Sequence, residues 1–205
     1  VRAVLEARPP HLHLSREILD EEGGHEGVVH LMPAVPLNWL VVKKAPEGLD
    51  ARVQPGNGTH TLKLLAKAGM PRGPFRSEVV LGLEGKDGRP LPDQTVTVTG
   101  AVVGRYGVFP AESVFGICPV GTEATETLRV FDRKGGAFTV TAVRAGAGTE
   151  VQPRPGSAES LYDLRQRFVA PGETKARVTF ELRDARGVKH TVTHAISYYG
   201  STAGR

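Results

Sequence analysis

Two stretches decide the fold: Thr95-Val96-Thr97-Val98-Thr99 and Lys189-His190-Thr191-Val192-Thr193-His194-Ala195-Ile196. In both, apolar and polar side chains alternate with a period of two, which places the apolar ones on one face of an extended chain. Val, Ile and Thr suit such a strand because their restricted χ1 angle is tolerated on a pleated surface. We therefore expect strands that are buried on one face only.

Similar runs recur along the chain and are separated by turn-forming glycines and prolines. Gly (25) and Pro (15) together make up 40 of 205 residues, which leaves little room for long helices. The segment from Leu161 to Phe168 has helical spacing, but Tyr162, Leu164 and Phe168 also fit alternation, and we expect a strand. The other expected strands span residues 27–32, 37–43, 50–54, 59–66, 77–83, 106–109, 125–131, 137–144, 148–152 and 175–183. Short strands with a turn about every ten residues predict an antiparallel sandwich.

The sequence repeats itself after about 100 residues, the size of one immunoglobulin-like sandwich. Residues 73–83 match residues 172–182, and Val53-Gln54-Pro55 recurs as Val151-Gln152-Pro153. The fold class that we predict is all-β, with two tandem immunoglobulin-like antiparallel β-sandwiches spanning residues 1–104 and 105–205. Residues 1–7 resemble the end of the first repeat, and we expect that they are the last strand of a preceding repeat.

The alternation also predicts which side chains fill the core. In the first repeat, Leu37, Trp39 and Val41 are expected to point inward. Burying one such side chain contributes roughly 1.5–3 kcal/mol to stability. The second core is expected to contain Val114, Leu128, Val130, Phe138, Val140, Leu164, Phe168, Val178, Phe180, Val192 and Ile196.

These patterns carry a family resemblance. The segment Val108-Phe109-Pro110-Ala111-Glu112-Ser113-Val114-Phe115-Gly116, the strand 138–143, the turn Pro171-Gly172 and the closing pattern at 96–100 resemble a bacterial immunoglobulin-like family of unknown function. That family is related to the Hydin-type and major-sperm-protein-type sandwiches. The first repeat departs from the pattern at residues 15–30. The resemblance implies an exported, extracytoplasmic bacterial protein with repeated domains and no catalysis, and it supplies no catalytic residues.

Two pairs of histidines are the candidates for metal binding. His11 and His13 stand two residues apart on an expected edge strand, about 6–7 Å from each other. A stable site needs three or four ligands, and residues 20–22 supply carboxylates without fixed geometry. His190 and His194 lie about 13 Å apart along their strand, so they cannot share an ion, and we expect both to face outward. We expect no metal site at either place.

The remaining candidates are single residues. Cys118 has no partner motif for a nucleophile, and we expect a small residue near a buried strand end. Of the neighbours Tyr198 and Tyr199, one must point outward because successive strand residues face opposite sides. Trp39 is expected in the core, with sugar stacking as its alternative role. Gly146-Ala147-Gly148 precedes a strand rather than a helix, the wrong context for phosphate binding.

Charge and composition exclude several classes of function. The net charge is +4, but the basic residues are scattered among acidic ones, so we expect no nucleic-acid partner. No apolar run reaches the roughly 18 residues of a membrane span. We expect no enzyme, and no catalytic, cofactor-binding or metal-binding residues. The prediction is a non-catalytic tandem module that acts as a structural spacer or protein-interaction domain of a larger exported protein. The alternative is a carbohydrate-binding or cell-wall-binding accessory domain of an enzyme.

Overall fold

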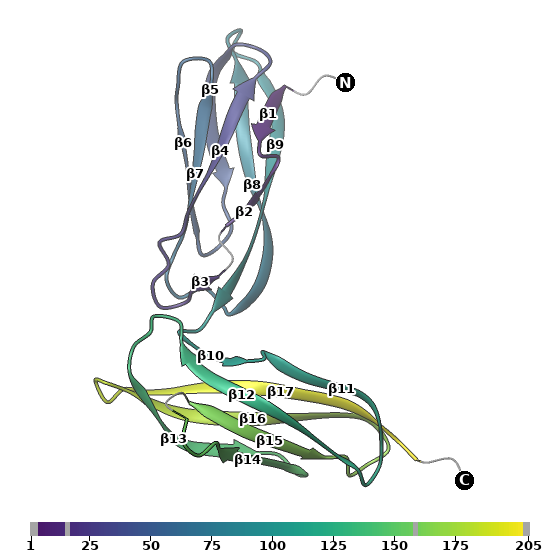
Figure 1. Cartoon of the computed structure of the whole chain (residues 1–205). Coiled ribbons are helices and arrows are strands. Elements are labelled where there is room, and N and C mark those ends of the chain that lie inside the picture. The colour runs from purple at the N-terminus through teal and green to yellow at the C-terminus, as the bar shows by residue number, and fades with distance from the viewer. Residues whose placement is uncertain (1–3, 15–16, 158–159, 203–205) are drawn as a thin grey trace. The chain divides into compact units, whose positions relative to one another are not determined.

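The chain folds into two units that are each built from strands alone in the described part (Figure 1). The computed structural model describes residues 4–14, 17–157 and 160–202. The units are Val1–Gly104 and Arg105–Arg205. Within the described ranges no helix is long and apolar enough to cross a membrane. The all-β class with immunoglobulin-like sandwiches is confirmed, and each strand range expected from the sequence coincides with a strand.

Unit 1 is a sandwich of two sheets. The first sheet has the strand order β1-β4-β7-β6, and the second has the order β2-β9-β8-β5, with the short β3 also paired to β9. Strands β2 and β3 run parallel to β9, and the other pairs are antiparallel. The strands are β1 (Leu5–Arg8), β2 (His11–His13), β3 (Ile18–Leu19), β4 (Glu26–Pro33), β5 (Leu37–Lys44), β6 (Leu49–Gln54), β7 (His60–Ala66), β8 (Gly73–Gly85) and β9 (Pro90–Val103).

Unit 2 repeats this topology. Its sheets have the orders β10-β12-β15-β14 and β11-β17-β16-β13, and β11 runs parallel to β17. A long strand of the second sheet has an equivalent in each unit: β8 of unit 1 and β16 of unit 2 both contain 13 residues, and they begin at Gly73 and Gly172. The strands are β10 (Tyr106–Phe109), β11 (Glu112–Pro119), β12 (Glu123–Asp132), β13 (Phe138–Ala145), β14 (Thr149–Pro153), β15 (Leu161–Arg167), β16 (Gly172–Asp184) and β17 (Lys189–Ser201).

The first strand belongs to unit 1 itself. We expected residues 1–7 to close a preceding repeat, but Leu5–Arg8 pairs antiparallel with β4, and the Leu5 side chain is buried in the core of unit 1. The corresponding strand of unit 2 is β10, which pairs with β12 in the same way. The expectation was therefore wrong for the described residues of this segment, because the first strand of the sandwich has the same pattern as the last. Residues 1–3 lie outside the described part.

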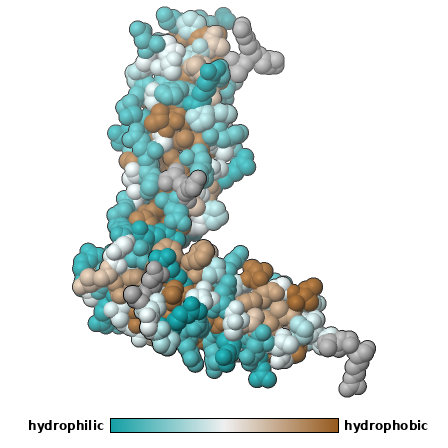
Figure 2. Space-filling model, in the orientation of Figure 1, coloured by the Kyte–Doolittle hydropathy of each residue, from teal (hydrophilic) through white to brown (hydrophobic). Residues whose placement is uncertain are grey.

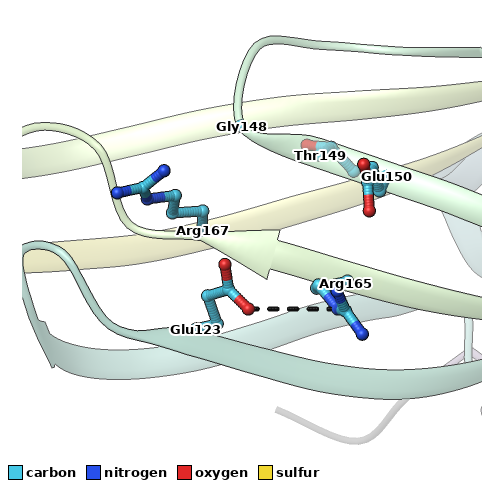
Figure 3. Close-up of a pocket in the computed structure, with 6 residues that line it drawn as sticks. All are labelled: Glu123, Gly148, Thr149, Glu150, Arg165 and Arg167. Carbon is cyan, nitrogen blue, oxygen red and sulfur yellow. Dashed lines mark ion pairs between the residues drawn. The ribbon is translucent and has the colours of Figure 1, made fainter.

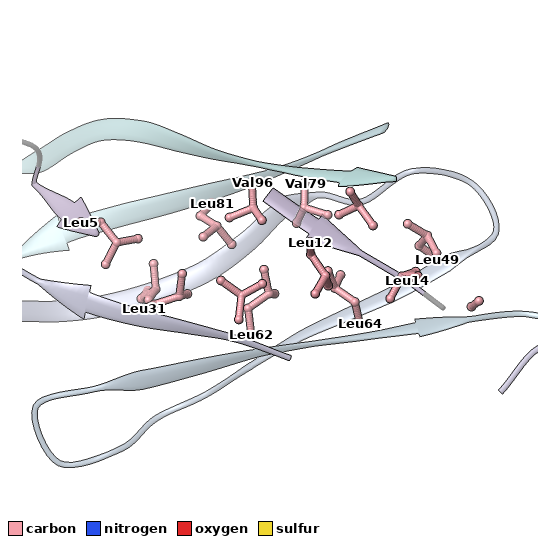
Figure 4. Packing of buried hydrophobic residues seen from close by; sticks show 14 of the residues in the cluster. Leu5, Leu12, Leu14, Leu31, Leu49, Leu62, Leu64, Val79, Leu81 and Val96 are labelled. Carbon is pink, nitrogen blue, oxygen red and sulfur yellow. The ribbon is translucent and has the colours of Figure 1, made fainter. Parts of the chain in front are cut away.

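Each unit has its own hydrophobic core between its two sheets, and Figure 4 shows that of unit 1. In unit 1, side chains from facing sheets such as Leu62, Leu64, Val79 and Leu81 are fully buried. In unit 2, Phe180 is fully buried, and its ring packs edge-on against Tyr162 with centroids 5.1 Å apart. The expected core positions Leu128, Val130, Leu164, Phe168, Val178, Phe180 and Ile196 are buried, and Phe138, Val140 and Val192 pack against the core from partly buried positions.

Two parts of the expected core were wrong because the strands do not alternate without interruption. In β5 the register shifts between Leu37 and Trp39, so that Leu40 is buried while Val41 is 44% exposed. Trp39 is half-buried and lies outside the core cluster. In β11 the residue that faces inward is Ser113, and Val114 is 66% exposed. The inward position is set by pairing with β17, where Ser113 lies beside the buried Ile196.

Candidate functional site

An exposed apolar surface lies on unit 2, toward the end of β17 (Figure 2). We call it the apolar surface and define it as Val114, Ile117, Val120 and Tyr199. Ile117 of β11 and Tyr199 of β17 are direct neighbours and are 76% and 54% exposed. Val120 follows β11, and its backbone N–H donates to the Ser201 carbonyl. The largest exposed apolar surface of a folded monomer is often a functional one.

A rigid aromatic cluster supports this surface from inside. Phe168 packs edge-on against Phe115 and Tyr198, with ring centroids 5.8 Å and 4.8 Å apart. Cys118 is buried in the same cluster, and its Sγ lies 3.3 Å from the Phe115 carbonyl oxygen. Tyr198 therefore faces inward and Tyr199 outward, as the alternation predicted. Cys118 is the buried small residue that the sequence indicated.

Unit 1 has a polar side chain at three positions of this surface and an alanine at the fourth. The strand registers make Val114 equivalent to His13, and Tyr199 equivalent to Ala101, because the paired strands run in the same alignment in both units. By the same alignment, Ile117 and Val120 correspond to Glu17 and Asp20. The sandwich thus folds without large apolar groups at these places. Stability of the fold therefore does not explain why unit 2 exposes apolar side chains there.

A second unusual feature of unit 2 is a buried polar trio: Ser113, Glu126 and His194. Ser113 Oγ lies 2.7 Å from His194 Nε2 and also donates to Glu126 Oε2. Both Ser113 and His194 are buried, and the equivalent positions of unit 1 hold Leu12, Gly27 and Val96. A buried polar group lowers stability unless it is hydrogen-bonded. Unit 2 therefore contains a polar network where its duplicate has an apolar contact.

The order of groups in this trio does not activate the serine. In a hydrolytic triad the histidine stands between the hydroxyl and the carboxylate and accepts the hydroxyl proton. Here Ser113 stands in the middle and gives its single proton to Glu126, so His194 Nε2 must carry a proton and donate it. The hydroxyl is also closed off from solvent. The trio joins β11, β12 and β17 and has no geometry for nucleophilic attack.

His190 and His194 do not face outward as expected. They share the side of β17 that carries Val192 and Ile196, so both lie on the core side. The His190 ring packs against Tyr106 at 4.7 Å, and its Nε2 lies 3.5 Å from Asp184 Oδ2. Burial lowers the pKa of His194, although the nearby Glu126 and Glu112 and the Pro110 and Ala111 carbonyls act in the opposite direction. The expectation was wrong because it placed both histidines on the same face of the strand as Thr191 and Thr193, although they alternate with these threonines.

The first histidine pair is not brought together with other ligands. His11 and His13 are exposed on β2, and His13 Nδ1 lies 3.0 Å from Thr99 Oγ1. Asp20 turns instead to Arg72, with an oxygen–nitrogen distance of 2.6 Å. In the ranges that the structure describes, no group of three or more His, Cys, Asp or Glu side chains could hold a metal ion.

An open hollow of about 350 Å³ lies beside β12, β14 and β15 of unit 2 (Figure 3). Glu123 and Arg165 form an ion pair across it, with atoms 3.9 Å apart, while Thr149 donates to Gln166 Oε1 at 2.6 Å. Its lining is Glu123, Gly148, Thr149, Glu150, Arg165 and Arg167. The two carboxylates balance the two guanidinium groups, so this hollow shows no preference for a charged ligand.

Unit 1 has a hollow on the same sheet, between β4, β6 and β7, with a volume of about 250 Å³. By the strand registers it corresponds to a neighbouring hollow of unit 2, of about 340 Å³, whose lining includes Thr125 and Asp163. Different side chains line the hollow of unit 1, among them Glu26 and Lys63, whose charged atoms lie 3.4 Å apart. Because both units have hollows along this sheet with unrelated linings, we attribute these hollows to the twist of the sheet. They are properties of the fold rather than specialised sites.

Sequence reasoning missed both special features of unit 2. The trio had a signal: His194 stands two residues from Val192 and two from Ile196, which were both expected inside. The signal for the apolar surface was weaker, because its members come from β11, β17 and the turn after β11, which only the fold brings together.

No protein-family model and no curated protein matches the sequence. Solved structures do resemble the fold. A protein of unknown function from Porphyromonas gingivalis W83 is 14% identical, with a TM-score of 0.40, 96% of this chain covered and 100% of that one. The titin immunoglobulin tandem A164-A165 is 12% identical, with a TM-score of 0.31 and 97% of both chains covered.

An endo-fucoidan hydrolase, MfFcnA4 from glycoside hydrolase family 107, is 15% identical, with a TM-score of 0.34 and 92% of this chain covered. The match spans only 29% of the hydrolase's own length. At these identities the likeness concerns the fold, and no activity or ligand is carried over from any of these proteins. The resemblance to a bacterial family of unknown function stays a prediction.

Proposed function

We propose that the chain is a non-catalytic tandem module of an exported bacterial protein that binds a protein partner through the apolar surface of unit 2. The observation that supports this proposal is the contrast between the two units. At equivalent positions unit 1 has His13, Glu17 and Asp20, while unit 2 exposes Val114, Ile117 and Val120. Exposed apolar groups that the fold does not require favour association, because burial removes them from water.

Face-to-face docking is favoured over the addition of a strand to a sheet edge. The edge strand β11 contains a register shift between Val114 and Ile117, with Gly116 at a φ of 69°, and it ends at Pro119. The opposite edge, β13, is also bulged between Val140 and Ala142. Bulges and prolines are the devices by which native sheets prevent edge pairing. The contact therefore uses side chains.

The occupant that we propose is a second copy of the same surface. At its border, Glu173 and Lys175 of β16 form an ion pair at 2.8 Å, and Glu173 lies beside Tyr199. Two charges of opposite sign side by side are self-complementary, because a two-fold axis sets each carboxylate against the other copy's ammonium. Four side chains make a surface of at most a few hundred Å², below the roughly 800 Å² per partner of a stable dimer. We expect a weak dimer, with a dissociation constant between about 10 μM and 1 mM.

Sedimentation equilibrium of the full chain tests this proposal. The mean mass of the wild type should rise above 21.9 kDa as the concentration increases toward about 1 mM. Ile117→Asp and Tyr199→Asp should each remain monomeric, because they place an unpaired charge in the contact. Val41→Asp is the matched control, since Val41 is an exposed valine of unit 1.

The control should associate like the wild type. A wild type that stays at the monomer mass over the whole range, or a Val41→Asp variant that loses association equally, would contradict the second-copy contact. Circular dichroism should give unchanged spectra for all three variants, because the substituted side chains are exposed.

A further inference from the structure

A second hollow of unit 2 has a different character. It measures about 290 Å³ and lies over β16, between the bulge of β13 and the beginning of β17. Arg183 of β16 and Lys189 of β17 are direct cross-strand neighbours at this hollow, and both are exposed. We call it the basic hollow. Lys189 and Tyr199 are ten residues apart on one strand, so the basic hollow lies roughly 33 Å from the apolar surface.

The two cations of the basic hollow are not neutralised. Within the described residues neither Arg183 nor Lys189 has a carboxylate partner. Glu181, which also lines the hollow, is paired with Arg144 at 2.7 Å. Asp184 is buried and accepts hydrogen bonds from the backbone of Arg186 and Val188 instead. Like charges directly opposite each other on neighbouring strands are destabilising. The pair thus leaves positive charge facing an open cavity.

Hydroxyl groups also line the hollow, beside Leu182 and His190, and the His190 Nε2 lies 3.5 Å from Asp184 Oδ2. Thr191 lies beside Lys189 on β17, and Thr141 is the extra residue of the β13 bulge. The Thr141 hydroxyl donates to the Glu181 carbonyl at 3.1 Å, which fixes its position at the wall of the hollow. Bulges often re-aim a side chain in this way. A guanidinium, an ammonium and two hydroxyls around one cavity are suited to an oxyanion attached to a sugar, because they can bind both the charge and ring hydroxyls.

Unit 1 shows that the fold does not need these cations. The pair Arg183–Lys189 corresponds to Glu84–Pro90, which occupy the same register positions on β8 and β9. Glu84 is satisfied there by a hydrogen bond from the Asn38 amide. The change from an acid and a proline to two bases reverses the local charge while keeping the sandwich. The basic hollow is therefore a feature of unit 2 alone.

We propose that the basic hollow binds one carboxylate or sulfate group of an acidic polysaccharide. Its volume is at the low end for ligand sites, which suits one charged sugar residue rather than a longer ligand. Nucleic acid would need a row of cations along its backbone, and only two unpaired ones converge here. An acidic peptide would need a free sheet edge or apolar pockets for its side chains, but the adjoining β13 edge is bulged and the lining is mostly polar.

Calorimetric titration of the full chain with polygalacturonate, dextran sulfate and neutral dextran tests the proposal. We expect binding of at least one acidic polymer and none of neutral dextran, with affinity that falls as salt is raised. The double variant Arg183→Gln/Lys189→Gln should bind about tenfold or more weakly. Arg165→Gln/Arg167→Gln is the matched control, because it removes the same charge from the other sheet of unit 2.

The control should retain wild-type affinity within about twofold. Equal loss in the two double variants would show attraction by net charge alone and would overturn the site. Binding of polyglutamate as tightly as either acidic polysaccharide would overturn the assignment to a sugar polymer. Binding of inorganic sulfate without binding of either acidic polysaccharide would show that the hollow takes a free anion and not a polysaccharide. The thermal midpoint of Arg183→Gln/Lys189→Gln should not fall, since it removes a like-charge pair. Self-association through the apolar surface should be unchanged in this variant, which separates the two proposals.

Discussion

The His194 imidazole is removed from water in the interior of unit 2, where the duplicate position holds Val96. Its hydrogen bond with Ser113 Oγ compensates part of the desolvation, and Ser113 in turn is bonded to Glu126. Nδ1 has no hydrogen-bond partner within the described residues. A neutral ring is tolerated in this environment far better than an imidazolium, which explains the direction of its pKa.

We predict that unit 2 loses stability when the pH falls below neutrality. The folded-state pKa of His194 lies below the ordinary value of 6.5, so the unfolded chain binds the proton more readily. Stability from the neutral ring is complete above about pH 6.5 and is lost as the pH falls from there through the folded-state pKa. The loss is about 1.4 kcal/mol for every tenfold difference in proton affinity.

Urea unfolding of the wild type and His194→Gln at pH values from 8 to 5 measures this effect. Glutamine retains a polar group but does not titrate, so the difference in unfolding free energy between the two proteins isolates His194. That difference should shrink or reverse in favour of His194→Gln as the pH is lowered. A difference that is independent of pH would show that His194 has the same pKa in the folded and unfolded chains.

The burial of His194 could be inferred from the sequence, and that of Ser113 could not. The alternation of β17 is unbroken from Lys189 to Ser201, so the side of His194 follows from Val192 and Ile196. Ser113 stands between Glu112 and Val114, and hydrophobicity alone favours Val114 as the inward residue. Only the pairing of β11 with β17 decides which of the two is buried.

At the scale of the element, register shifts limit what alternation can predict. Strands without a shift, such as β16 beside β17, show the expected inward residues over their whole length. In β5 the shift between Leu37 and Trp39 moves Leu40 and Val42 to the core and Val41 to the surface. A bulge adds one residue and reverses the parity of everything after it. Its position is set by the partner strand, which a local pattern does not contain.

The exposed position of Val114, which the alternation had placed in the core, can be tested at this scale. Val178→Asp should unfold unit 2, because Val178 is fully buried and the aspartate charge would have no partner. Val114→Asp should change the unfolding free energy by no more than about 0.5 kcal/mol, since its side chain is exposed. Urea unfolding followed by tyrosine fluorescence measures both. Val114→Asp unfolding as readily as Val178→Asp would place Val114 in the core after all.

At the scale of the whole chain, duplication explains both the repeat in the sequence and the differences in chemistry. The two units keep the same strand orders and equivalent core positions, such as Val79 and Val178. They differ in the polar trio, the apolar surface and the basic hollow, and each of these is specific to unit 2. Because unit 1 has the same fold without these features, comparison with unit 1 identifies the residues of unit 2 that the fold does not require.

Separate cores lead to a last prediction, that each unit unfolds without the other. Val79→Asp introduces a charge into the core of unit 1, and Val178→Asp does so in unit 2. Hydrogen exchange measured by mass spectrometry on the full chain should show lost protection in residues 1–104 for the first variant and in residues 105–205 for the second. Val79→Asp should also retain self-association and binding of an acidic polysaccharide, whereas Val178→Asp should lose both. Loss of protection throughout the chain in either variant would contradict this prediction and show that the two units unfold cooperatively.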